Sequence, residues 1–212
     1  MLSLYLVRHG QTDASLHNRF CGRLDPPLNG TGQAMAEALA VRYGDFGFAE
    51  IVASPLARAQ QTAAPTARRA GLSVTLDDGL LEIDYGEWDG RGESEVERDD
   101  AARFHQWSTH PGRVGPPGGE SGAVIAARAL PAIERIRARH PDGGKVLVVS
   151  HKATLRVILC ALLGLDVDLF RARIAQKVCA VSVIDWKRSG PLLQVLGDTS
   201  HLPPALQAGD GT

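Results

Sequence analysis

The stretch Leu4-Tyr5-Leu6-Val7-Arg8-His9-Gly10 joins a short apolar run to a cationic turn. Short apolar runs bounded by turn residues are typical of buried strands, so residues 4–7 predict a strand. Two further apolar runs end in a similar way: residues 51–53 lead into Ser54-Pro55-Leu56-Ala57-Arg58, and residues 146–149 lead into Ser150-His151. In open α/β sheets, ligands bind at the carboxyl ends of the strands. We therefore expect the three turns to face one pocket.

The rest of the chain alternates apolar runs with alanine-rich helical patterns, which is typical of a mostly parallel sheet covered by helices on both faces. The sequence thus predicts a three-layer α/β fold. Strands are expected at residues 4–7, 51–53, 74–76, 146–149, 180–186 and 192–196, and helices at 31–43, 55–70, 121–139 and 154–163. Only Lys187–Pro191 separates the last two strands, which favours an antiparallel hairpin. Pro65 is expected to kink or split the second helix.

The domain organisation is expected to be simple. A chain of 212 residues without an internal repeat is within reach of one α/β domain, which we place at residues 1–202. Residues 91–120 form a polar segment with a Pro/Gly-rich exit, and they predict a short helical insertion over the active site. Phe104 and Trp107 within it are expected to be buried against the sheet or to line the substrate entrance. Residues 203–212 predict a flexible tail.

The charge balance excludes several classes of partner. Lys plus Arg (23) and Asp plus Glu (24) nearly cancel, so no global field favours binding to nucleic acid or to an anionic membrane. The longest apolar stretch, residues 146–165, is broken by three basic side chains, which argues against a membrane span. Three scattered cysteines indicate neither a disulfide framework nor a zinc site. With no signal-peptide pattern at the start of the sequence, we expect a cytoplasmic monomer or homodimer.

The three turns carry residue types that suit the binding and attack of a phosphoryl group. Ser54 followed by Pro55 predicts a helix N-cap, which places Arg58 near a helix N-terminus where anions are favoured. A neutral His9 imidazole is a competent nucleophile toward phosphorus, while Arg8, Arg58 and a protonated His151 would hold the charge of the transferring group. Gly10 is expected to let the backbone approach the phosphate closely.

The proton donor for the departing oxygen is expected in the acidic segment at residues 80–90. Glu82 is flanked by Leu81 and Ile83, and desolvation beside a phosphate dianion favours its protonated form. After donating the proton, Glu82 would act as base toward the water that hydrolyses the phosphohistidine. The other carboxylates of this segment are interpreted as solvated loop residues.

Four ordered motifs together resemble the histidine phosphatase superfamily, also called the phosphoglycerate mutase-like family. They are Arg8-His9-Gly10-Gln11-Thr12, residues 54–62, residues 82–90, and Ser150-His151. The resemblance implies a mixed α/β sheet between helices, a phosphorylated His9, a phosphate pocket of Arg8, Arg58 and His151, and Glu82 as proton donor. It also implies that neither a metal nor another cofactor is needed. The short segment Pro116–Ser121, where family mutases usually carry a long insertion, resembles the phosphatase branch.

Two positions depart from the family pattern. Ser15 stands where the family usually has Asn, and Lys152 follows the second histidine where glycine is usual. We expect Gln11, Ser15, Arg19 and Lys152 to contact the phosphate or the substrate. As a hypothesis, Lys152 with Arg19 or Arg23 selects substrates that carry a second anionic group, such as phosphorylated sugar acids.

The sequence therefore predicts a metal-independent phosphatase of a small phosphorylated metabolite, such as a sugar phosphate or a phosphorylated sugar acid. Two alternatives remain open at this point. A cofactor-dependent phosphoglycerate mutase would return the phosphoryl group to a substrate instead of passing it to water. An inactive phosphate-binding regulator would keep the fold and lose turnover, with Ser15 and Lys152 as signs of decay.

Overall fold

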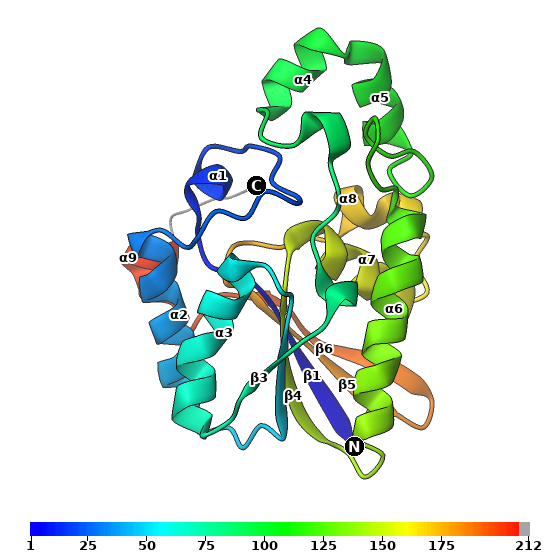
Figure 1. Cartoon of the computed structure of the whole chain (residues 1–212). Helices are drawn as coiled ribbons and strands as arrows, with labels where there is room; N and C mark the ends of the chain where they lie inside the picture. Colours follow the sequence, from blue (N-terminus) through cyan, green and yellow to red (C-terminus); the bar gives the residue numbers. More distant parts are fainter. Residues whose placement is uncertain (208–212) are drawn as a thin grey trace.

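The sheet has six strands in the order β3-β2-β4-β1-β5-β6 in the computed structural model, which describes residues 1–207 (Figure 1). The strands are β1 (Leu2–Arg8), β2 (Glu50–Ala53), β3 (Val74–Leu76), β4 (Gly144–Ser150), β5 (Val181–Lys187) and β6 (Gly190–Asp198). The first four are mutually parallel, whereas β5 runs antiparallel to both β1 and β6. The predicted mixed sheet with a C-terminal hairpin is confirmed.

Helices cover both faces of this sheet. They are α1 (Asp13–Leu16), α2 (Gly30–Tyr43), α3 (Ala57–Ala70), α4 (Glu93–Asp99), α5 (Ala101–Thr109), α6 (Gly122–Arg139), α7 (Lys152–Leu162), α8 (Phe170–Arg173) and α9 (Pro204–Gln207), with short 3-10 turns η1 (Asp78–Leu80), η2 (Gly86–Trp88) and η3 (Val167–Leu169). Helices α2 and α3 lie on one side of the sheet, and α6 and α7 lie on the other (Figure 1). None of the helices described is long and apolar enough to cross a membrane.

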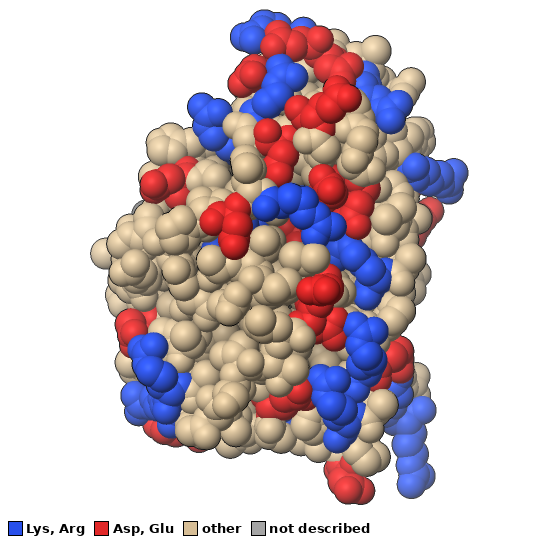
Figure 2. Space-filling view, viewed as in Figure 1, with Lys and Arg blue, Asp and Glu red and all other residues tan. Residues whose placement is uncertain are grey.

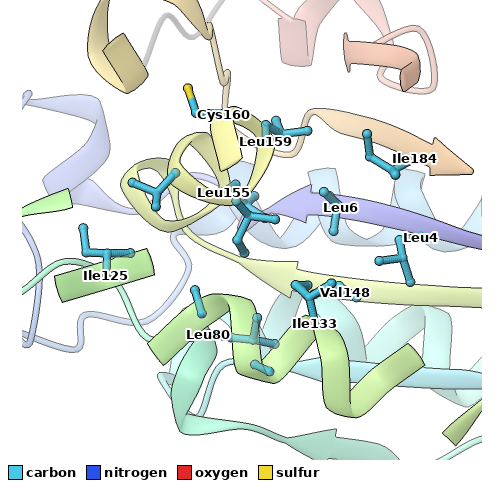
Figure 3. Close-up of a cluster of buried hydrophobic side chains, with 14 of the residues drawn as sticks. Leu4, Leu6, Leu80, Ile125, Ile133, Val148, Leu155, Leu159, Cys160 and Ile184 are labelled. Atoms are coloured by element: carbon cyan, nitrogen blue, oxygen red, sulfur yellow. The ribbon is translucent and has the colours of Figure 1, made fainter. Parts of the chain in front are cut away.

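Two hydrophobic cores sandwich the central strands, because alternate side chains of a strand point to opposite faces. Leu4 and Leu6 of β1 pack with α6 and α7 in one core, seen in Figure 3, whereas Val7 packs with α2 and α3 in the other. Val148 and Val149 of β4 divide between the two cores in the same way. Burial of a whole apolar side chain stabilises the fold by about 1.5–3 kcal/mol. This double burial holds the carboxyl ends of β1 and β4 in place.

The start of α3 differs from the prediction. The helix begins at Ala57 with Leu56 as its N-cap, so the expected cap by Ser54 is wrong. Both carboxylate oxygens of Asp25 accept the Ala57 N–H at 2.9 Å instead. The Ser54 hydroxyl is hydrogen-bonded to His151 at 2.8 Å, and it accepts the Leu56 N–H at 3.4 Å, ahead of the first helical residue. Pro65 lies inside a continuous helix that its packed neighbours hold together, so the helix is not split.

Residues 93–109 form the two helices α4 and α5, which lie above the carboxyl ends of the strands (Figure 1). Their apolar residues form a separate aromatic core with Phe20 and Trp88, in which Trp107 is 1% exposed. Burial of Phe104 and Trp107 thus occurs against the loops at the strand ends. Residues 204–207 form α9, and the remainder of the expected tail, residues 208–212, lies outside the described part of the chain.

The turn that carries His9 touches the start of α2 through two glycines. A Cβ added to Gly32 would lie 2.1 Å from the Gln11 carbonyl oxygen, and one added to Gly10 would lie 2.7 Å from the Gly32 oxygen. Real side chains do not reach such distances, so the two backbones would have to separate. Close packing of main chain against main chain therefore explains why both positions are glycine.

This contact leads to a stability prediction. Gly32→Ala should lower the free energy of unfolding by about 1–3 kcal/mol, the usual cost of overpacking. Gly30→Ala, two residues earlier in the same helix, is the matched control, because nothing lies within 4 Å of an added Cβ there. Its free energy of unfolding should be unchanged or slightly higher. Urea denaturation measures both, and equal midpoints for the two variants would contradict the packing argument.

Candidate active site

A single cavity lies at the carboxyl ends of the parallel strands, as the three turns predict. Seven of the residues proposed from sequence line it: Arg8, His9, Ser15, Arg19, Arg58, Glu82 and Lys152. His151 stands directly behind His9, with 5.1 Å between the two ring centroids. Strand β1 supplies Arg8 and the turn after it supplies His9. The first turn of α3 supplies Arg58, and the junction of β4 and α7 supplies His151 and Lys152. Segments far apart in sequence therefore meet at one site.

His9 is held as a neutral imidazole with a defined tautomer. Its Nδ1 lies 2.8 Å from the Gly10 carbonyl oxygen, which can only accept, so Nδ1 carries the proton. The lone pair is consequently on Nε2. Burial, and then the positive charges of Arg58 and Arg8, hold the pKa of His9 well below its ordinary value of 6.5. The ring is therefore in the form that can attack phosphorus.

His151 is also neutral, which differs from the imidazolium expected from the sequence. The guanidinium Nε of Arg58 donates to Nδ1 at 3.2 Å, and a second N–H could not occupy that position. Nε2 therefore carries the proton and donates it to the Ser54 hydroxyl at 2.8 Å. Burial and the charge of Arg58 hold the pKa of His151 well below its usual range. The positive charge of this part of the site resides on the arginines.

Both proposed arginines are fixed by backbone carbonyls. Arg58 is 1% exposed, and its terminal nitrogens donate to carbonyls of the loop at residues 21–24 over 2.8 to 3.2 Å. Arg8 donates to the Gln176 carbonyl at 2.7 Å. Burial lowers the pKa of Arg8 to about 10, which still leaves it charged at neutral pH. Donors fixed in this way stabilise developing charge without having to reorganise.

Glu82 lies on the same cavity and is anchored at the N-terminus of α7. Its Oε1 accepts the backbone N–H of Ile83 at 2.9 Å and that of Thr154 at 3.2 Å. Its Oε2 accepts the Ala153 N–H at 3.3 Å. A helix N-terminus favours negative charge. The carboxyl group is thus held in one orientation on the cavity that His9 also lines, while its role as proton donor stays a prediction.

Besides His151, which stands behind His9, two residues expected to touch the phosphate are not among those that line the cavity. The N–H of Gly10 donates to the Thr62 hydroxyl at 2.9 Å, and the Cα of Gly10 faces Gly32. The side-chain oxygen of Gln11 accepts from Asn29 at 3.1 Å. Gly10 and Gln11 face α2 and α3, away from the cavity, because they bind the turn after β1 to those helices.

Three further polar residues that the sequence links to the phosphate or the substrate, Ser15, Arg19 and Arg23, divide between two environments. Ser15 lines the cavity and forms a capping box with Thr12. The backbone N–H of Thr12 donates to the Ser15 hydroxyl at 2.9 Å. Arg19 also lines the cavity and donates to the Gly90 carbonyl at 2.9 Å. Arg23 instead pairs with Asp84 at 3.5 Å and Glu120 at 3.7 Å, and the cavity lining does not include it.

The sequence analysis missed two basic residues of the lining, Arg156 of α7 and Arg171 of α8. Arg156 follows Lys152 by four residues, and such residues share a helix face. The sequence pattern predicts this helix only from residue 154, which leaves Lys152 outside it and hides the face that Lys152 shares with Arg156. Among the residues described, no group of three or more His, Cys, Asp or Glu side chains is arranged to hold a metal ion.

The cavity is far more positive than the molecular surface. Acidic and basic side chains are interspersed over the face seen in Figure 2, in line with a net charge of −1. The lining, by contrast, includes Arg8, Arg19, Arg58, Lys152, Arg156 and Arg171 against two carboxylates, Glu82 and Glu93. Such a concentration of positive charge attracts anions locally.

The fold and the site together define an α/β protein whose strand-end cavity presents a neutral histidine pair between fixed arginines. A family model described as histidine phosphatase superfamily (branch 1) matches residues 4–199. This chain therefore belongs to the histidine phosphatase superfamily, and the resemblance seen in the four motifs is confirmed.

Similar proteins carry both mutase and phosphatase names. A probable phosphoglycerate mutase of Enterobacter sp. (strain 638) is 35% identical over 97% of this chain and 98% of its own length. Phosphoserine phosphatase 1 of Hydrogenobacter thermophilus is 34% identical over 95% of each chain. The solved structure of a mycobacterial glucosyl-3-phosphoglycerate phosphatase superposes with a TM-score of 0.87 at 28% identity, covering 94% of this chain and 100% of that one.

Proposed function

We propose that this chain is a phosphatase that hydrolyses a small phosphorylated metabolite through a phosphohistidine intermediate on His9. The observation that carries the proposal is the state of His9, a buried neutral imidazole with its lone pair on Nε2, on a cavity that Arg8 and Arg58 also line. The names of the phosphoserine and glucosyl-3-phosphoglycerate phosphatases support the same reaction type.

The first half-reaction transfers the phosphoryl group to the protein. Nε2 of His9 attacks phosphorus, a P–N bond forms, and the ester P–O bond breaks. Arg8 and Arg58 stabilise the negative charge on the transferring group. Protonated Glu82 donates its proton to the departing oxygen, so that the alcohol leaves neutral.

The second half-reaction restores the enzyme. The carboxylate of Glu82 takes a proton from a water molecule as that water attacks the phosphohistidine. The P–O bond forms, the P–N bond breaks, and the electron pair returns to Nε2 of His9. Inorganic phosphate then leaves, and Glu82 is again protonated for the next cycle.

A second candidate activity is phosphoryl transfer, because the relative from Enterobacter is named a probable phosphoglycerate mutase. A mutase keeps the phosphoryl group on histidine until a second hydroxyl accepts it, whereas a phosphatase admits water. Within the described residues, the two short helices α4 and α5 are the only helices between the acidic segment at residues 80–90 and α6. This short insertion supports the phosphatase.

The organisation and location of the chain are also part of the proposal. Both hydrophobic cores share the one sheet, which supports a single domain over residues 1–202 with residues 91–120 as an insertion over the site. Cys21, Cys160 and Cys179 are all free thiols, which supports a reducing, cytoplasmic compartment.

Phosphate release from a panel of esters tests the proposal. The purified chain should liberate inorganic phosphate in equal amount to the alcohol from at least one sugar, sugar-acid or amino-acid phosphate. The proposed chemistry uses side chains alone, so EDTA should leave the rate unchanged. Transfer between positions of phosphoglycerate, stimulated by a bisphosphorylated primer and without phosphate release, would identify the mutase. Absence of any turnover, including that of 4-nitrophenyl phosphate, would identify a phosphate-binding regulator.

A further inference from the structure

One wall of the cavity carries three cationic side chains beyond the pair that flanks His9. Lys152 and Arg156 come from α7, and Arg171 comes from α8. Residues four apart lie on one face of a helix, separated by about one turn, or about 5.4 Å along the axis. Because Lys152 directly follows His151, its position is near the two histidines, and Arg156 lies one turn farther along α7.

Two of these three side chains have no acidic partner. Within residues 1–207, neither Lys152 nor Arg156 forms an ion pair, and the buried Nε of Arg156 has no hydrogen-bond partner. Arg171 differs, because it pairs with Glu93 at 3.2 Å and lies 3.6 Å over the Trp107 ring. A buried donor without a partner costs free energy. An anion bound at Lys152 and Arg156 would supply the missing acceptor.

The charge of the cavity exceeds what one phosphate can balance. Six cationic side chains face two carboxylates on the lining. A phosphate monoester dianion carries two negative charges, and the cations outnumber the carboxylates by more than that. Three of the six cations lie on α7 and α8, in addition to the arginine pair that flanks His9, so the excess favours a substrate that is anionic at both ends.

We propose that Lys152 and Arg156 form a subsite for a second anionic group of the substrate, a carboxylate or a second phosphate, about one helical turn from the reacting phosphate. This inference rests on the proposed phosphatase function and narrows its substrate class. Arg23, which the sequence analysis placed in this role, is occupied by Asp84 and Glu120 instead.

Matched pairs of substrates test the subsite. Glycerol 3-phosphate and 3-phosphoglycerate differ only in a terminal carboxylate, and fructose 6-phosphate and fructose 1,6-bisphosphate differ in a second phosphate. The quantity to measure is the ratio of kcat/KM for the doubly anionic ester to that for its partner. The pair with the larger ratio identifies the preferred anion, carboxylate or phosphate. In the unmodified protein at least one ratio should exceed about tenfold, because a charge-assisted hydrogen bond contributes on this scale.

Variants of Arg156 test whether this residue causes the preference for doubly anionic substrates. Arg156→Met keeps an unbranched apolar stem and should reduce the preferred ratio about tenfold, whereas Arg156→Lys, which keeps the charge, should retain most of it. Arg173→Met is the matched control, since Arg173 is an exposed residue of α8 outside the cavity lining, and its ratio should equal that of the unmodified protein. An unchanged ratio in Arg156→Met would overturn the proposal. If the unmodified protein released phosphate from none of the esters, the proposed function itself would be overturned.

The unmodified protein offers a second measurement that needs no variant. Burial, and then the charges of Arg8, Arg156 and Arg171, lower the pKa of Lys152 to about 7, and Glu82 opposes this shift. The lysine is charged below that pH and neutral above it. The ratio of kcat/KM for 3-phosphoglycerate to that for glycerol 3-phosphate should therefore fall as pH rises through about 7. Both substrates carry the same ester phosphate, so only the carboxylate of 3-phosphoglycerate responds to the lost charge of Lys152. A ratio that stays constant across this range would remove Lys152 from the subsite.

Discussion

Replacing His9 by alanine should abolish turnover while the chain stays folded. The His9 imidazole lines the cavity and is the proposed nucleophile. Alanine has no side-chain nitrogen, so it cannot form the P–N bond. Removal of a nucleophile from a site that acts as a unit costs on the order of 10⁴-fold or more in kcat. Phosphate release from 4-nitrophenyl phosphate measures the loss, and thermal unfolding checks the fold.

The control for this substitution is His17→Ala. His17 is exposed and does not line the cavity, so its removal should leave turnover within about twofold. Labelled substrate gives an independent readout: phosphohistidine survives alkali, so an alkaline quench should trap label on the unmodified protein and none on His9→Ala. Turnover or label that persists without His9 would refute the mechanism.

Replacing Glu82 by glutamine should slow hydrolysis in a manner that depends on the leaving group. A general acid contributes typically 10²–10⁴-fold, and an amide cannot give up a proton. Esters of simple alcohols need that proton, so their kcat/KM should fall within this range. Nitrophenolate leaves without protonation, so kcat/KM for 4-nitrophenyl phosphate should fall much less. This parameter reports the steps through P–O cleavage and does not include the later attack of water.

Glu87→Gln is the matched control for this experiment. Glu87 belongs to the same acidic segment, is exposed and is absent from the cavity lining, so its loss should leave both esters unaffected. Glutamine at position 82 also loses the contact that Oε2 makes with the Ala153 N–H. If kcat/KM fell equally for both leaving groups, Glu82 would act through that structural contact and not as an acid.

The sheet and the convergence of the three turns are predictable from sequence because both follow from local pattern. Residues 4–7, 51–53 and 146–149 are short apolar runs that end in cationic or imidazole-bearing residues, and parallel strands bring such ends to one edge. The resulting site contains His9, Arg8 and Arg58 together. Neither the pairing partners nor the exact ends of the strands were needed for this conclusion.

The details that escaped prediction depend on contacts between distant segments. The neutral state of His151 follows from the N–H that Arg58 presents to it across 93 residues of sequence. The capping of α3 by Asp25, and the placement of Arg156 on the cavity, are likewise set by packing that no local pattern encodes. Gly10 carried a correct signal of close approach, but the neighbour is the backbone of Gly32 and not a ligand.

The contact between Gly10 and Gly32 has an evolutionary consequence. Main chain meets main chain there, so this part of the placement of His9 does not depend on the size or shape of a side chain. Apolar residues in the two cores can be exchanged for others of similar volume over generations, at a cost in stability, without displacing the imidazole. Substrate preference can then diverge through the cavity wall while the reaction itself is inherited unchanged.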